Sequence, residues 1–185
     1  MGEGHIWKRL AAHPEQIGYP VALALHHVQV GKSSGYLDLM LIPDAGCVDN
    51  GHRLVLIEAK RAKSDEASCQ VIGQLLKYYV RALEIGDEGL NGLKKFAQRI
   101  RDGQKPPKKL ISLKAVFGTH TLEDAYERVA KGRKLEPAEI GLIVAIDEYQ
   151  PKLQRRLLYI TEVLRTRHAL PIRVALVSNR RVRYI

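Results

Sequence analysis

Three side chains in the first third of the sequence have the types and spacing that metal-assisted acid–base chemistry requires. Asp38 lies among apolar neighbours in the run GYLDLMLI, and Glu58 and Lys60 end the run RLVLIEAK. Because side chains alternate along a strand, Glu58 and Lys60 are expected on one face. The turn signal Asp49-Asn50-Gly51 separates the two runs and favours a hairpin. Such a hairpin would bring Asp38 beside Glu58.

Two adjacent carboxylates repel each other unless a divalent cation lies between them. Ligation by oxygen atoms alone suits Mg²⁺ or Mn²⁺ and not zinc. Such a cation would polarise a phosphate and lower the pKa of a bound water. Lys60 would then orient or deprotonate that water, or neutralise charge in the transition state. The alternative is a Glu58–Lys60 ion pair at the end of a strand, with Asp38 in a turn.

A polar helix face is predicted shortly after these residues. Gln70, Gln74 and Tyr78 follow one another at intervals of four in the helical pattern of residues 66–84, so they share one face. That face could approach the carboxylates and hold the water, the Lys60 nitrogen or a substrate phosphate. An exposed polar face with a half-buried tyrosine is the competing interpretation.

Apolar periodicity predicts the elements that position these side chains. In chain order they are a helix over 3–13, strands over 21–30, 35–42 and 53–60, the helix over 66–84 with Val71, Leu75, Leu76 and Val80 as its buried stripe, a helix over 93–101, a strand over 111–117, a helix over 122–130, a strand over 140–146, a helix marked by Leu153, Leu157, Ile160 and Leu164, and a strand over 172–177. Strands mixed with helices in this order indicate an α/β fold, a mixed β-sheet flanked by helices. The length favours one domain over residues 1–185.

A strand bearing Asp38, an apolar strand ending in IEAK some 20 residues later and a helix containing QLLKY together resemble the PD-(D/E)xK nuclease superfamily, in its RecB-type branch with a QxxxY motif. The resemblance covers about residues 3–84, and the strand at 140–146 would supply a later strand of the family. It implies a restriction-endonuclease-like core. Leu37 stands where the family pattern has proline.

The resemblance also implies roles for individual residues. Asp38, Glu58 and Lys60 would be the metal-binding and catalytic residues, and Gln74 and Tyr78 match QxxxY. Many members carry a glutamate on the first helix that points at the metal. Glu3 is the best match, although a structural role for it is equally open.

The positive charge of the chain is concentrated in two blocks. The formal net charge is +10, yet residues 1–90 carry nine Lys and Arg against eleven Asp and Glu. Residues 91–115 carry eight basic residues against one acidic, and residues 151–185 carry nine against one. Basic blocks of this kind hold the phosphates of a polyanion without reading its sequence, although a solvated surface is the simpler alternative. The candidate nucleic-acid-binding residues are Lys94, Lys95, Arg99, Arg101, Lys105, Lys108, Lys109, Arg155, Arg156, Arg180, Arg181 and Arg183.

Composition narrows the class of protein. The two cysteines, Cys47 and Cys69, lack metal-binding spacing, which argues against a disulfide scaffold or zinc ribbon and favours a reducing, cytoplasmic compartment. No apolar run approaches the roughly 18 residues of a membrane span. No recognition helix or aromatic platform for single strands is evident in the sequence.

Several aromatic and histidine residues have competing interpretations. Adjacent residues of a strand point to opposite faces, so His26 and His27 are not expected to face one ion. His52 is expected at a hairpin tip. Tyr36, next to the candidate site, either packs or stacks on a base.

The resulting expectation is a Mg²⁺-dependent nuclease that acts on DNA. The alternatives are a non-catalytic nucleic-acid-binding module and a subunit of a repair or restriction assembly. A homodimer also stays open.

Overall fold

The computed structural model describes residues 3–19, 22–30, 35–43, 51–64, 69–84, 134–147, 150–170, 172–179 and 181–185. The elements predicted over 93–101, 111–117 and 122–130 lie outside these residues.

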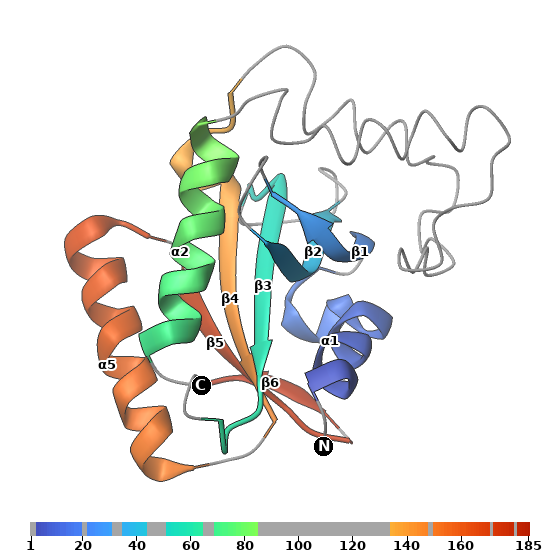
Figure 1. The fold of residues 1–185 in the computed structure, drawn as a ribbon, viewed down its shortest axis with the longest axis vertical. Helices are drawn as coiled ribbons and strands as arrows, with labels where there is room; N and C mark the ends of the chain where they lie inside the picture. Colours follow the sequence, from blue (N-terminus) through green and yellow to red (C-terminus); the bar gives the residue numbers. More distant parts are fainter. Residues whose placement is uncertain are drawn as a thin grey trace, which may run out of the picture.

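A mixed six-stranded sheet forms the centre of the molecule, with the strands in chain order from one edge to the other (Figure 1). The strands are β1 (Ala22–Gln29), β2 (Tyr36–Pro43), β3 (Leu54–Lys60), β4 (Ile140–Ile146), β5 (Ile172–Val177) and β6 (Val182–Tyr184). The first three are antiparallel, β3, β4 and β5 are parallel, and β6 returns antiparallel to β5. The predicted α/β fold with a mixed sheet is confirmed.

Within the described residues, three helices flank the sheet. They are α1 (Glu3–Ala12), α2 (Cys69–Glu84) and α5 (Pro151–His168), with the short 3-10 helices η1 (Pro14–Ile17) and η4 (Pro137–Glu139) in connections. Figure 1 shows α2 and α5 on one side of the sheet and α1 on the other. Among the described helices, none has the length and apolar character needed to cross a membrane.

The central strand β3 is buried on both faces. Leu54 and Leu56 belong to the core beneath α2 and α5, whereas Val55 and Ile57 belong to the core beneath α1. Since successive side chains alternate, Glu58 continues the series that faces α2. The register of β3 therefore directs this carboxylate toward the helix that carries the QxxxY residues.

The buried side of α2 differs from the predicted stripe. Val71 and Leu75 are buried as expected, but Val80 is 46 % exposed and Leu76 is only partly buried. The apolar face continues instead through Tyr78 and Ala82, because the helix is rotated so that the Tyr78 ring meets the sheet. The stripe prediction was wrong at Val80.

His52 is another correction. Its side chain is buried, and the Tyr19 hydroxyl lies 2.7 Å from its Nδ1 atom. Burial lowers the pKa of His52 to about 4, so the ring is neutral at pH 7. A Cβ atom on Gly141 would lie only 2.7 Å from the His52 Nδ1 atom. His52 is thus a buried residue that packs against Tyr19 and against Gly141 of β4, and it is not at an exposed hairpin tip.

Candidate functional site

The β2–β3 hairpin brings Asp38 and Glu58 together. Leu39 pairs with Ile57, and the same register continued by one residue sets Asp38 opposite Glu58. The backbone N–H of Ala59 donates to Asp38 Oδ2 at 2.9 Å, and the backbone N–H of Asp38 donates to the Glu58 carboxylate. Each strand thus holds the carboxylate of the other, and the two acids are fixed side by side.

Burial and mutual repulsion hold both carboxyl groups toward their protonated forms. Burial and, after it, the neighbouring Asp38 charge raise the pKa of Glu58 to about 8, although Lys60 opposes the shift. Burial also raises the pKa of Asp38, against the Ala59 N–H and the Lys60 charge. The two groups titrate as a coupled pair. A cation bound between them would favour the ionised forms and displace a proton.

One oxygen of the site lacks the partner that a buried carboxylate requires. Glu58 Oε2 is inaccessible to solvent and makes no hydrogen bond within the described structure. Gln74 Oε1 on α2 is in the same condition. Buried oxygens without donors fit a bound hard cation, or water on such a cation.

Few side chains of the site could ligate a metal ion directly. In the part of the chain that the structure describes, no three or more His, Cys, Asp and Glu side chains form a ready metal cluster. A centre here would therefore use the two carboxylates and complete its shell with water and substrate oxygens. That is how proteins usually hold Mg²⁺, which keeps several of its waters.

Helix α2 brings Tyr78 to the same place. The Tyr78 side chain is only 5 % exposed, and a Cβ atom on Gly35 would lie 3.3 Å from its hydroxyl. Burial, with the charges of Glu58 and Asp38, raises the pKa of Tyr78 to about 12, which keeps the hydroxyl protonated. Gln74 lies one helical turn earlier and is partly buried, so it shares this face.

Gln70, by contrast, is exposed at the start of α2. Its side chain is not part of the buried polar face that Gln74 and Tyr78 form.

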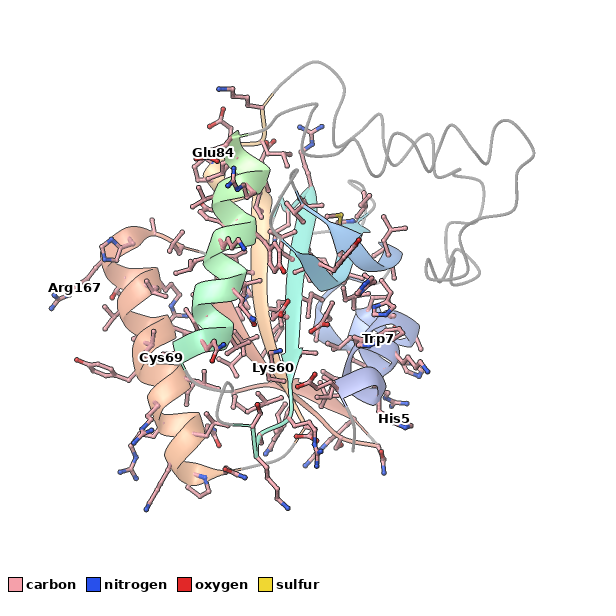
Figure 2. The ribbon with its side chains drawn as sticks, viewed as in Figure 1. His5, Trp7, Lys60, Cys69, Glu84 and Arg167 are labelled. Carbon is pink, nitrogen blue, oxygen red and sulfur yellow. The ribbon has the colours of Figure 1, made fainter. Side chains whose placement is uncertain are left out.

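Lys60 and Glu3 complete the charges around the two acids. The Lys60 charge lowers the pKa of both Asp38 and Glu58, and the Glu3 charge raises both. Figure 2 shows Lys60 at the C-terminal end of β3, at the end of the sheet where α2 begins with Cys69. Glu3 thus acts on the pair from α1 as an electrostatic neighbour.

The two adjacent histidines lie together, contrary to the sequence prediction. His27 has a φ of 56°, a left-handed conformation that interrupts the alternation of β1. The His26 and His27 ring centroids are therefore only 5.5 Å apart. His26 also reaches the site, because its Nδ1 atom lies 2.6 Å from the backbone oxygen of Asp38. The expectation of opposite faces was wrong.

A basic pocket lies at the same end of the sheet. Lys63, Lys152 and Arg156, with Ala62, Ser64, Gln150 and Leu153, line a hollow of about 390 Å³. It follows the C-terminal ends of the parallel strands β3 and β4, where ligands of α/β folds commonly bind. The Ala62 N–H donates to Asp147 Oδ1 at 2.8 Å, which fixes the turn after β3 to the end of β4.

The other predicted basic residues divide into two groups. Arg155 is exposed on α5, and Arg181 and Arg183 are exposed around the β5–β6 turn, which follows the C-terminal end of β5. The following candidates lie outside the described residues: Lys94, Lys95, Arg99, Arg101, Lys105, Lys108, Lys109 and Arg180. Sequence reasoning missed Lys63 and Lys152, although the run of basic residues at 60–63 and Lys152 one turn before Arg156 were visible signals.

Comparison with family models, with curated proteins and with solved structures finds no match to this chain. The superfamily assignment therefore stays a prediction, and the geometry around Asp38 and Glu58 has to carry the functional inference.

Proposed function

We propose that this chain is a Mg²⁺-dependent nuclease that hydrolyses phosphodiester bonds in DNA, built on a restriction-endonuclease-like core. One observation carries the proposal: a buried Glu58 oxygen without a hydrogen-bond partner lies in a carboxylate pair with Asp38, within the field of Lys60. Most buried polar atoms of native proteins have a hydrogen-bond partner, so a buried carboxylate oxygen without one favours a ligand that the side chains do not supply.

Each side chain of the site has its own role in the proposed hydrolysis. Asp38 and Glu58 would hold Mg²⁺ or Mn²⁺, which when bound lowers the pKa of water and polarises the phosphate. Lys60 orients the attacking water and neutralises the negative charge that grows on the phosphate oxygens. Tyr78 stays protonated, so its hydroxyl donates a hydrogen bond to a water or phosphate oxygen, and Gln74 supports the water from the preceding turn of α2. Glu3 adds a third negative charge nearby, which strengthens attraction for a cation.

The basic pocket supplies the binding surface for the polymer. Lys63 lies in the turn after β3, and Lys152 and Arg156 lie on α5, which covers the same side of the sheet as α2 (Figure 1). The hollow that they line therefore lies beyond the end of the strand that carries Lys60. Phosphate oxygens are the acceptors that such cations attract. A DNA strand that runs from this pocket to Asp38 and Glu58 would place one of its phosphodiester groups beside the two carboxylates.

Charge reversal in the pocket is expected to weaken DNA binding in a salt-dependent manner. Arg156→Glu should lower DNA affinity at least several-fold at low salt, because a phosphate contact is replaced by repulsion. The slope of log affinity against log salt concentration should fall by about one. Fluorescence anisotropy of labelled DNA in EDTA measures both quantities. Arg167→Glu, at the other end of α5, is the matched control, and an equal loss in both variants would contradict a role specific to the pocket.

The proposed activity is tested on purified wild-type protein. Supercoiled, linear, single-stranded and branched DNA are incubated with Mg²⁺, with Mn²⁺ or with EDTA, and products are resolved by gel electrophoresis. Cleavage of at least one substrate with a divalent cation, and none with EDTA, is expected. DNA binding without turnover under every condition would contradict the proposal. That result would favour the alternative, a non-catalytic nucleic-acid-binding module or a subunit of a repair or restriction assembly.

A further inference from the structure

Four aromatic rings form a row beside the candidate site, and the last ring of the row is exposed. Trp7 stacks on His26 with ring centroids 3.6 Å apart and an interplanar angle of 11°. His27 stacks on Tyr36 at 4.1 Å and 6°. The two pairs meet between His26 and His27, 5.5 Å apart. Trp7, at one end, is 7 % exposed, whereas Tyr36, at the other, is 53 % exposed.

A strained backbone makes the row possible. His26 and Val28 are paired with β2, but His27 between them has a φ of 56°. Residues other than glycine seldom adopt this backbone conformation, least of all inside a strand. A regular strand would send the His26 and His27 rings to opposite faces, which would break the row. Strain retained at such a cost is concentrated at functional sites.

The exposed end of the row lies at the rim of the carboxylate site. Tyr36 precedes Asp38 by two residues on β2, which is about 7 Å along a strand. Its neighbour Gly35 approaches the Tyr78 hydroxyl, and His26 contacts the backbone oxygen of Asp38. Figure 2 shows Trp7 on α1, on the side of the sheet away from α2. The row thus ends with an exposed ring beside the residues that would hold the cation.

We propose that the Tyr36 ring is a platform on which an unpaired DNA base stacks next to the carboxylate site. His27 covers the ring by parallel stacking and fixes its orientation, while half of the Tyr36 surface stays exposed for a ligand. Bases inside a duplex are already stacked on one another, so only a single strand or an opened end can offer a base face. Aromatic stacking of this kind accepts any base. The inference rests on the proposed function in naming DNA as the ligand, and it adds that the preferred form is single-stranded.

A packing role alone explains the buried end of the row but not the exposed one. Trp7 is almost fully covered, as a ring that contributes to the core should be. Lys8 lies 5.5 Å above the Trp7 ring and adds a positive charge along the same row. A positive charge beside stacking rings is the combination that single-strand-binding grooves use.

The test measures binding in EDTA, where no cleavage takes place. Fluorescence anisotropy compares a single-stranded oligonucleotide with the duplex of the same sequence, for the wild type and for Tyr36→Leu, Tyr36→Trp and Tyr159→Leu. Tyr36→Leu should weaken single-strand binding about tenfold and duplex binding less than twofold. Tyr36→Trp keeps a stacking ring and should bind as the wild type does. Tyr159 is 72 % exposed on α5, which packs mainly against β5, and its variant should change neither affinity.

A second measurement needs no variant. An oligonucleotide with a single 2-aminopurine should change its fluorescence on binding to the wild type when that base is unpaired and should change little within a duplex. Unchanged single-strand affinity in folded Tyr36→Leu protein, or an equal loss for both forms of DNA, would overturn the platform. These binding measurements contain EDTA and so do not depend on nuclease activity. If the protein cleaves no DNA but still prefers single strands through Tyr36, the proposed function is contradicted and the platform is supported.

Discussion

Asp38→Asn and Lys60→Met are each expected to lower Mg²⁺-dependent DNA cleavage by about 10³-fold, a loss typical of removing one acid–base or electrostatic group from an active site. The first change removes a negative charge that would hold the cation. The second removes the positive charge at the end of β3, where it acts on both carboxylates. Rate measurements at saturating DNA give the comparison, since they separate turnover from binding.

Binding and folding should survive both changes. Lys60 is only partly buried at the end of its strand, and asparagine can still accept the Ala59 N–H bond that Asp38 accepts. DNA affinity in EDTA should therefore stay within about threefold of the wild type. Lys77→Met, on the exposed side of α2, is the matched control for loss of a lysine and should cleave normally. Full activity in either Asp38→Asn or Lys60→Met would refute the assigned site.

The metal-free protein is expected to lose stability as the pH rises from 5 to 8. Folding raises the pKa of Glu58 from 4.5 to about 8, so the folded state keeps a proton that the unfolded state has already released. The proton-linked stability is thus complete below pH 4.5 and is lost as the pH rises through 8. Asp38, whose pKa is also raised, acts in the same direction. The loss should amount to roughly 2 to 4 kcal/mol, or about 5 to 10 °C in the melting temperature.

Glu58→Gln isolates this effect, because glutamine mimics the protonated carboxyl at every pH. In EDTA the variant should match the wild type near pH 5 and exceed its melting temperature at pH 8. Glu84→Gln, an exposed glutamate paired with Arg81 at the end of α2, should show the pH profile of the wild type. If the melting curves of the wild type and Glu58→Gln run parallel across this range, Glu58 is not held in its protonated form.

Local sequence patterns predicted the part of the site that depends on strand periodicity. The alternation of β3 set Glu58 and Lys60 on one face, and the turn signal near Gly51 correctly indicated the hairpin that sets Asp38 opposite Glu58. Spacing by four residues likewise predicted that Gln74 and Tyr78 share one face of α2. In each case a single backbone period decides the outcome.

Contacts between distant segments decided what the sequence did not reveal. The burial of His52 depends on Tyr19 and Gly141, which are distant from it in the sequence. The His26–His27 geometry depends on a left-handed residue that strand periodicity assumes away. At three residues, β6 is too short for a periodic signal, and it forms only because β5 provides a partner strand.

The most direct test of the central claim is calorimetric titration of Mn²⁺ into the wild type and Glu58→Gln at pH 7.5, in buffers of different ionisation enthalpy. A site made by Asp38 and Glu58 predicts one ion bound per chain and release of most of one proton, because the pKa of Glu58 near 8 leaves it largely protonated before the cation binds. Affinity should fall at least tenfold in Glu58→Gln. Equal affinity in the two proteins, or binding without proton release, would contradict a metal centre at this carboxylate pair.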